Sequence, residues 1–182
     1  MYEVEVKVRA DHDAVRDRLA DLDAEPLGTV EQIDTYFDAP HRDFAETDEA
    51  LRLREERDSE GALTELTYKG PLVEAESKTR EEIESEVADR ERVQAIFESL
   101  GFSPAATVEK ERTRYRIDEF TVTLDSVADV GEFVEVETEC EREADVPGER
   151  EAAQDLLQSL DLDPDDGIRT SYLGMLLADG DA

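Results

Sequence analysis

The chain has 182 residues, which is enough for one domain with a buried core, and we expect residues 1–182 to form a single domain. Its 51 acidic and 20 basic residues give a net charge of −31, spread along the whole length, and so acidic a field argues against a nucleic-acid partner. The single cysteine, Cys140, excludes an intramolecular disulfide and a cysteine-based zinc site, and no apolar stretch is long enough to cross a bilayer, so we expect a cytoplasmic protein without a membrane partner.

The first half of the chain shows mainly strand patterns. Residues 2–9 alternate charged and apolar side chains, as a strand does, so we expect no signal peptide ahead of them. A helix with apolar residues on one side follows at about residues 11–22. Further strands are predicted at residues 29–37, 50–57, 62–69 and 79–87, with a hairpin turn at 58–61 and a polar loop at 71–78.

The second half combines a strand meander with three helices. A helix begins at Asp89 and stops at Gly101. Strands are predicted at residues 105–117, 119–127 and 131–139, followed by helices at about 149–160 and 171–178. Most connections are short, which favours antiparallel pairing, and the helices can cover the apolar side of the sheet. The pattern therefore predicts an α+β protein.

Most of the predicted strands carry their charges on one face. In the first strand, Glu3, Glu5 and Lys7 lie on the face opposite three valines. A purely basic row, Lys110, Arg112, Arg114 and Arg116, lies on one face of a later strand. The other charged faces carry Arg52 and Arg54; Arg80, Glu82 and Glu84; Asp125; and Glu135 and Glu137. The simplest interpretation is an antiparallel sheet with one solvated face.

Two observations favour a charged interior instead. A solvated face on so acidic a protein should be dominated by acids, and the basic row is not. Only four lysines occur, and three of them, Lys7, Lys69 and Lys110, fall on these strands. The acidic excess and the scarcity of lysine also suggest adaptation to a high-salt, halophilic cytoplasm. If the sheet curls so that the charged faces converge, the basic side chains can bind phosphate oxygens. The carboxylates can then hold Mg²⁺ or Mn²⁺ bridging to the same phosphates.

The order of the charged segments points to a known family. The chain opens with Glu3-Val4-Glu5-Val6-Lys7. The later segments, in order, are residues 32–38, the paired arginines of 50–54, the lysine segment 67–71, 80–84, 110–112, 124–125 and 131–137. Together they resemble the motifs of the CYTH superfamily, which contains class IV adenylyl cyclases and thiamine and inorganic triphosphatases. Ser171-Tyr172 also resembles the late helix start of that family.

The resemblance implies a fold and a set of site residues. The fold is an eight-stranded antiparallel β-barrel, a triphosphate tunnel with helices packed outside. The implied triphosphate contacts are Lys7, Arg52, Arg54, Lys69, Arg80, Lys110, Arg112 and Arg114. The implied metal ligands are Glu3, Glu5, Asp125, Glu135 and Glu137, with Glu82 and Glu84 in a supporting or second-metal role. Catalysis is expected to depend on Lys7, Glu5 and Glu137. After residue 140 the last basic tunnel residue of the family has no clear counterpart, and Arg169 is not assigned.

Three functions remain open on this resemblance. The first is a class IV adenylyl cyclase-like enzyme that converts ATP to 3′,5′-cyclic AMP and pyrophosphate with Mg²⁺ or Mn²⁺. The second is hydrolysis of the terminal phosphate of thiamine triphosphate or tripolyphosphate in the same tunnel. The third is a non-catalytic polyphosphate- or nucleotide-binding module, which does not require metal carboxylates. We expect a monomer or homodimer whose partner is ATP or another triphosphate.

Three further expectations concern single residues. Lys110, Arg112 and Arg114 share a face without an intervening acid, so they should repel one another unless acids of neighbouring strands compensate. Arg112→Ala should then leave the ligand-free protein as stable as before, or slightly more stable, because one repulsive charge is removed. His12 lies beside polar segments and is expected to be solvated, and Cys140 is expected to be a packing residue.

Overall fold

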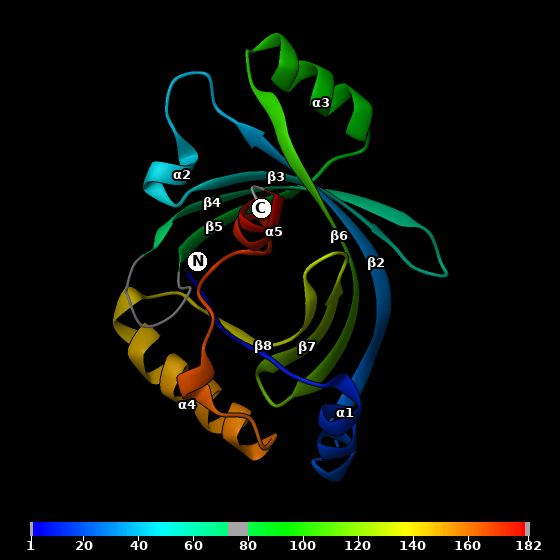
Figure 1. The fold of residues 1–182 in the computed structure, drawn as a ribbon, viewed down its shortest axis with the longest axis vertical. Coiled ribbons are helices and arrows are strands. Elements are labelled where there is room, and N and C mark those ends of the chain that lie inside the picture. Colours follow the sequence, from blue (N-terminus) through cyan, green and yellow to red (C-terminus); the bar gives the residue numbers. More distant parts are fainter. Residues whose placement is uncertain (1, 73–79, 181–182) are drawn as a thin grey trace.

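Eight strands close into an antiparallel barrel in the computed structural model, which describes residues 2–72 and 80–180 (Figure 1). The strand order around the barrel is β1-β5-β4-β3-β2-β6-β7-β8. The strands are β1 (Tyr2–Arg9), β2 (Glu25–Asp38), β3 (Ala50–Arg57), β4 (Ala62–Leu72), β5 (Arg80–Glu86), β6 (Ser103–Ile117), β7 (Phe120–Val127) and β8 (Gly131–Cys140). The predicted fold class, an eight-stranded antiparallel barrel with helices outside, is confirmed. Most of the predicted polar loop at 71–78 lies outside the described residues.

The helices join or cover the strands. They are α1 (His12–Asp21), α2 (Phe44–Thr47), α3 (Arg90–Ser99), α4 (Val146–Ser159) and α5 (Tyr172–Gly180), with 3₁₀ turns at Glu143–Asp145 and Pro164–Asp166. Aspartates cap α1, α2 and α3, because the carboxylates of Asp11, Asp43 and Asp89 accept hydrogen bonds from first-turn amides. The prediction missed the short helix α2. Within the described residues, no helix is both long and apolar enough to span a membrane.

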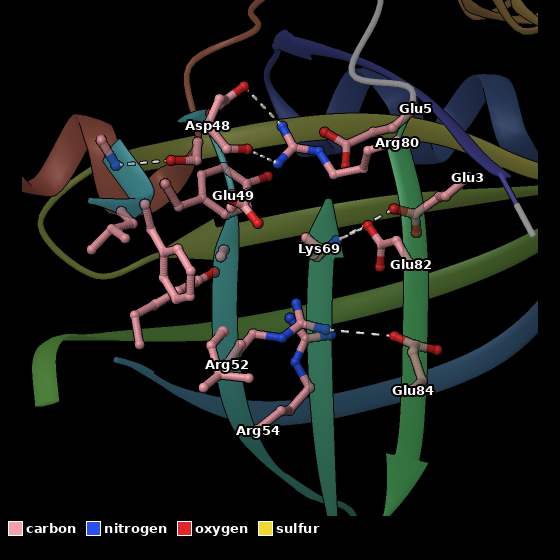
Figure 2. A pocket seen from close by; sticks show the side chains of 18 of the residues that line it. Glu3, Glu5, Asp48, Glu49, Arg52, Arg54, Lys69, Arg80, Glu82 and Glu84 are labelled. Carbon is pink, nitrogen blue, oxygen red and sulfur yellow. Dashed lines mark hydrogen bonds and ion pairs between the residues drawn. The ribbon is translucent and has the colours of Figure 1, made fainter. Parts of the chain in front are cut away.

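Strand register brings the charged faces together inside the barrel, as Figure 2 shows for part of the wall. Glu5 of β1 lies opposite Glu137 of β8, and Lys7 lies opposite Glu135. On the other side of β1, pairing with β5 consists of two residue pairs within the described residues, Tyr2 with Glu81 and Glu3 with Arg80. The barrel is therefore closed by a short seam between β1 and β5.

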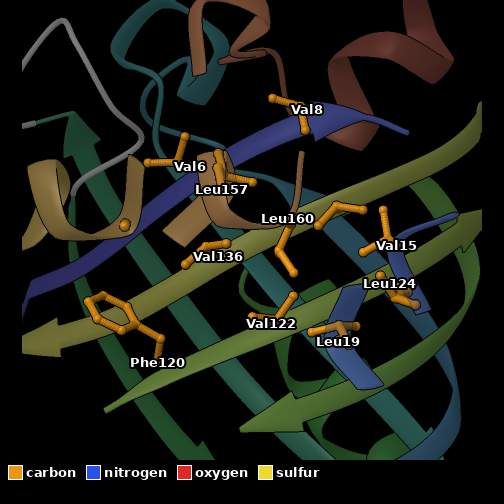
Figure 3. Close-up of a cluster of buried hydrophobic side chains, with 12 residues drawn as sticks. Val6, Val8, Val15, Leu19, Phe120, Val122, Leu124, Val136, Leu157 and Leu160 are labelled. Carbon is orange, nitrogen blue, oxygen red and sulfur yellow. The ribbon is translucent and has the colours of Figure 1, made fainter. Parts of the chain in front are cut away.

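The main hydrophobic core lies outside the barrel, between its wall and two helices (Figure 3). Val122 and Val136 of the wall are fully buried there, against Leu19 of α1 and Leu157 of α4. His12 at the start of α1 is buried beside this core, and its Nε2 lies 3.0 Å from the backbone oxygen of Phe133. The expectation of a solvated His12 was therefore wrong, whereas Cys140 is buried among apolar residues as expected.

The last helix, α5, lies against the barrel opening rather than on its outer wall (Figure 1). The chain leading to it is held to β1, because the backbone N–H of Ile168 donates to the carbonyl oxygen of Lys7 at 2.7 Å. Tyr172 then packs with Val108, Val127 and Phe133 in a second, smaller cluster. The C-terminal segment consequently forms part of the boundary of the barrel interior.

Candidate functional site

The inward faces of the strands and the start of α5 enclose a cavity of about 690 Å³. Every residue of the predicted site except Asp125 lines it. The lining members are Glu3, Glu5, Lys7, Arg52, Arg54, Lys69, Arg80, Glu82, Glu84, Lys110, Arg112, Arg114, Glu135 and Glu137. Acidic and basic side chains thus face one space, as Figure 2 shows for the part formed by β3, β4 and β5.

Two arginines of the cavity are held by aspartates buried behind them. Arg112 donates through Nε and Nη2 to the two oxygens of Asp125, at 2.7 and 2.5 Å, and Nη2 also donates to Glu135 at 2.6 Å. Arg54 makes the same two-pronged contact with Asp34, at 2.6 and 2.7 Å. Burial opposes ionisation of Asp34, but the Arg54 guanidinium holds the pKa of this carboxyl well below its usual range.

This geometry reverses the expectation for Arg112. The basic row has no acid within its own strand face, but Asp125 on the adjacent strand β7 and Glu135 on the next strand, β8, neutralise Arg112. Removing Arg112 would leave Asp125, which is fully buried, without its two-pronged partner. An uncompensated buried charge is strongly destabilising, so Arg112→Ala should lower stability.

Lys110 lies between these two ion pairs. Its Nζ is 3.8 Å from Asp34 and 3.7 Å from Asp125, and the residue is buried. Burial and the neighbouring Arg112 lower the pKa of Lys110 to about 7. A bound phosphate would add negative charge beside Lys110, and this would favour the protonated, cationic form of its amine.

The β4–β5 side of the cavity is held by side-chain links between elements. Lys69 of β4 contacts Glu82 of β5 and lies 3.3 Å from Glu3 of β1, so it bridges the seam of the barrel. Arg80 donates to the backbone oxygen of Asp48 at 2.8 Å and to its carboxylate at 3.2 Å. Figure 2 shows Lys69 and Arg80 reaching from their strands toward these partners.

The carboxylates on the β1–β8 side are crowded. Burial raises the pKa of Glu137 to about 8, and the carboxylates of Glu3, Glu135 and Glu5 act in the same direction, whereas Arg112 opposes them. Among the described residues, no group of three or more acidic, histidine or cysteine side chains is already arranged to hold a metal ion. The surplus of oxygen ligands nevertheless fits a divalent cation, which would relieve the repulsion between them.

A protein-family comparison identifies the barrel. The CYTH domain matches residues 1–172. The chain belongs to the CYTH family. A Methanocaldococcus jannaschii protein named provisionally as an adenylate cyclase is 37% identical over 174 residues, covering 95% of this chain and 97% of the relative. Adenylate cyclase CyaB of Aeromonas hydrophila is 30% identical over 163 residues, covering 88% of this chain and 81% of the relative.

Solved structures share this CYTH barrel. The PH1819 protein of Pyrococcus horikoshii OT3 superimposes with a TM-score of 0.91 at 35% identity, covering 97% of this chain and 99% of that protein. The HpAC1 protein of Hippeastrum, named provisionally as an adenylyl cyclase and described as having a dominant triphosphatase activity, superimposes with a TM-score of 0.61 at 21% identity over 88% of each chain. This second likeness concerns the fold alone.

The CYTH motifs did not identify every residue at the cavity. Asp125, implied as a metal ligand, lies behind Arg112, and its oxygens also accept from the Tyr172 hydroxyl at 2.9 Å. Its place in the metal set remains a prediction that this geometry does not favour. Arg169 lines the cavity although it was not assigned. Asp34 was part of a recognised segment, and its pairing with Arg54 gives it a supporting position that no motif indicated.

Proposed function

We propose that this CYTH protein is a metal-dependent enzyme acting on a triphosphate, and that its main reaction converts ATP to 3′,5′-cyclic AMP and pyrophosphate. The observation that carries the proposal is one cavity lined by basic side chains from β1, β3, β4, β5 and β6 and by carboxylates from β1, β5 and β8. Cations and acids held together in this way suit a polyanion that arrives with divalent cations. The adenylate cyclase names of two relatives favour the cyclase among such enzymes.

The basic side chains would bind the phosphate chain. Lys7, Arg52 and Lys69 lie on three different strands, so they can contact a phosphate chain from several directions. Arg54 and Arg112 are already oriented by Asp34 and Asp125, so little ordering would be needed when a phosphate binds. Such preoriented cations stabilise the charge that develops on a leaving pyrophosphate.

The metal would be held by the crowded carboxylates, Glu3, Glu5, Glu135 and Glu137, with Glu82 and Glu84 nearby. A bound Mg²⁺ or Mn²⁺ supplies Lewis-acid charge at the phosphate oxygens and lowers the pKa of a coordinated hydroxyl. A non-catalytic anion-binding module would not need these acids. Their position within the cavity therefore favours an enzyme.

Cyclisation of ATP requires in-line displacement at the α-phosphorus. The ribose 3′-oxygen forms a bond to the α-phosphorus while the bond from the α-phosphorus to the bridging oxygen of the β-phosphate breaks. The proton of the 3′-hydroxyl passes to a cavity carboxylate, a role that Glu5 or Glu137 can fill, and the leaving group is pyrophosphate, whose negative charge the basic side chains of the cavity would neutralise. Lys7, 3.7 Å from Glu5 and 3.6 Å from Glu135, lies where it can neutralise the attacked phosphate.

An apolar part of the cavity supports an organic substrate. The lining also includes Tyr36, Phe37, Phe44, Leu51, Leu173 and Leu177. Inorganic tripolyphosphate offers nothing to these side chains, whereas a nucleobase can stack and pack against them. This observation favours a nucleotide or another aromatic triphosphate over a purely inorganic one.

Hydrolysis is the second candidate, because the same charges would serve a water attacking the γ-phosphorus. The triphosphatase activity described for the Hippeastrum protein makes that reaction worth assaying here. The test is to incubate the protein at high salt with ATP, thiamine triphosphate and tripolyphosphate separately, with Mg²⁺ or Mn²⁺, and to identify the products. Cyclic AMP with pyrophosphate supports the proposal, and orthophosphate supports the second candidate. The absence of any metal-dependent product would contradict both.

A further inference from the structure

Tyr172 belongs to an apolar cluster, yet it also contacts several charged residues around the cavity. The residue begins α5 and is 7% exposed. The Lys7 Nζ lies 4.2 Å from the centroid of its ring, and the Lys110 Nζ lies 5.1 Å from it. On another side the ring packs against Phe133, with 5.0 Å between the centroids.

The hydroxyl of Tyr172 reaches a third part of the cationic wall. It donates to Oδ2 of Asp125 at 2.9 Å. The same oxygen accepts from Nη2 of Arg112 at 2.5 Å and lies 3.7 Å from Nζ of Lys110. One phenol side chain is therefore connected, directly or through one carboxylate, to three cations implied as triphosphate contacts.

The backbone brings α5 to the same place. The hydrogen bond from Ile168 to the carbonyl oxygen of Lys7 ties the segment ahead of α5 to the β1 residue that the ring covers. Tyr172 and the neighbouring residues Arg169, Thr170 and Ser171 then line the cavity. Seating of α5 and placement of the Lys7 ammonium are thus parts of one arrangement.

Packing alone would not require this side chain to be a tyrosine. Phenylalanine would fill the cluster of Val108, Val127 and Phe133 equally well, without bringing a hydroxyl into a buried region. The hydroxyl is used, because it donates to an ionised carboxylate, and such charge-assisted bonds are stronger and more directional than neutral ones. An aromatic face beneath two ammonium groups also attracts them electrostatically.

We propose that Tyr172 is a positioning residue of the triphosphate site, which orients Lys7 and Lys110 by its ring and Arg112 through Asp125. It does not itself contact the reacting atoms. The inference rests on the proposed function in one respect, namely that the anion bound in the cavity is a triphosphate. It assigns to the start of α5 a role in setting the phosphate-binding geometry.

Three variants separate positioning from packing. Tyr172→Phe keeps the ring and removes the bond to Asp125, and Tyr172→Leu removes both contacts. Met175→Ala is the matched control, because Met175 packs against the same apolar cluster and does not line the cavity. Calorimetry should measure tripolyphosphate binding at high salt, and melting temperature should report the loss of packing. Steady-state assays with ATP should give kcat and KM.

We expect Tyr172→Phe to bind tripolyphosphate about fivefold more weakly than wild type, and Tyr172→Leu roughly thirtyfold more weakly. Met175→Ala should bind within about twofold of wild type even if its melting temperature falls further than that of Tyr172→Phe. In ATP turnover, Tyr172→Phe should lower kcat as well as raise KM, because the cations it orients also act on the leaving group.

Equal binding by wild type and Tyr172→Phe would overturn the role of the hydroxyl. Equal losses in Tyr172→Leu and Met175→Ala would show that Tyr172 acts through packing alone. If Tyr172→Leu does not fold, the comparison of Tyr172→Phe with Met175→Ala decides. A wild-type protein that binds tripolyphosphate but yields no product would refute the proposed function. The tripolyphosphate affinities of the variants relative to wild type would still test the role of Tyr172. A wild-type protein that does not bind would refute both.

Discussion

Two parts of the barrel wall present similar charged side chains to the cavity, but they differ in the packing on their outer faces. The backed wall, formed by β1, β6, β7 and β8, has α1 and α4 packed on its outside, and Val122, Leu124, Val134 and Val136 are almost fully buried there. Among the described residues, the open wall, formed by β4 and β5, contributes to none of the buried hydrophobic clusters, and Ile83 on its outer face is 59% exposed. Both walls nevertheless present acidic and basic residues inward.

The difference suggests a division of roles. On the backed wall, Arg112 is fixed by the buried Asp125 and by a hydrophobic core behind the strand. On the open wall, Lys69 is linked to Glu3 across the seam of two described residue pairs between β1 and β5, and Arg80 is linked to Asp48, just ahead of β3. We therefore expect the backed wall to determine folding stability. The open wall should contribute to the site with a smaller effect on stability.

The largest expected contrast comes from the outer faces. Leu124→Ala should lower the free energy of unfolding by about 2–5 kcal/mol, because it removes buried methyl groups and leaves a cavity. Ile83→Ala on the open wall should change it by less than about 0.5 kcal/mol. Urea unfolding at high salt measures both. Similar losses in the two variants would show that the walls do not differ in support.

A second contrast concerns the inner faces. Arg112→Ala should destabilise the ligand-free protein by roughly 3 kcal/mol, because Asp125 is left buried without its main partner. Lys69→Met should cost less than about 1 kcal/mol, because its partners are partly exposed to the cavity. Both variants should bind tripolyphosphate more weakly than wild type. The comparison would break if Lys69→Met destabilised the ligand-free protein more than Arg112→Ala.

Acid titration tests the buried pair between the walls, Asp34 with Arg54. Because the folded-state pKa of Asp34 is lowered, its ionisation stabilises the fold above the usual aspartate pKa of about 4. That contribution is lost as the pH falls further, since the unfolded chain then binds more protons. The free energy of unfolding should consequently fall between about pH 5 and pH 3, and less steeply in Asp34→Asn. Equal slopes in the two proteins would remove Asp34 from this role.

Salt should change the stability of both walls alike, so we expect it to produce the smallest difference between them. The net charge of −31 produces surface repulsion that has a range of about 30 Å near 0.01 M salt and about 3 Å near 1 M. The melting temperature of wild type should therefore rise between these conditions, and Ile83→Ala should rise in parallel. A flat or falling melting temperature would contradict adaptation to high salt.

Most of the fold could be predicted because alternation along each strand is a local signal. Strand β2 was predicted to begin at residue 29 rather than at Glu25, because Pro26 and Gly28 interrupt the alternation where the register shifts. Helix α2 has four residues, too few for a helical period to show. The inward faces followed from the same alternation, which is why the implied cavity residues were placed together.

Contacts between distant segments could not be predicted in this way. Alternation places Asp125 on the inner face but does not show that Arg112, its cross-strand neighbour, covers it from the cavity. Tyr172 was recognised as a helix start, yet its bond to Asp125, 47 residues earlier, depends on where α5 docks. The compensation of the basic row likewise depends on acids from other strands.

The most direct test of the shared site is the rate of ATP turnover with limiting Mn²⁺ in wild type, Glu137→Gln from the backed wall and Lys69→Met from the open wall. Glu137→Gln removes one oxygen ligand of the implied metal set with little change in volume, so its fold should survive. If both walls act on one triphosphate, wild type forms product and each variant is slower by about a hundredfold or more while its circular dichroism is unchanged. No turnover by wild type, or near-wild-type turnover by either folded variant, would contradict that conclusion.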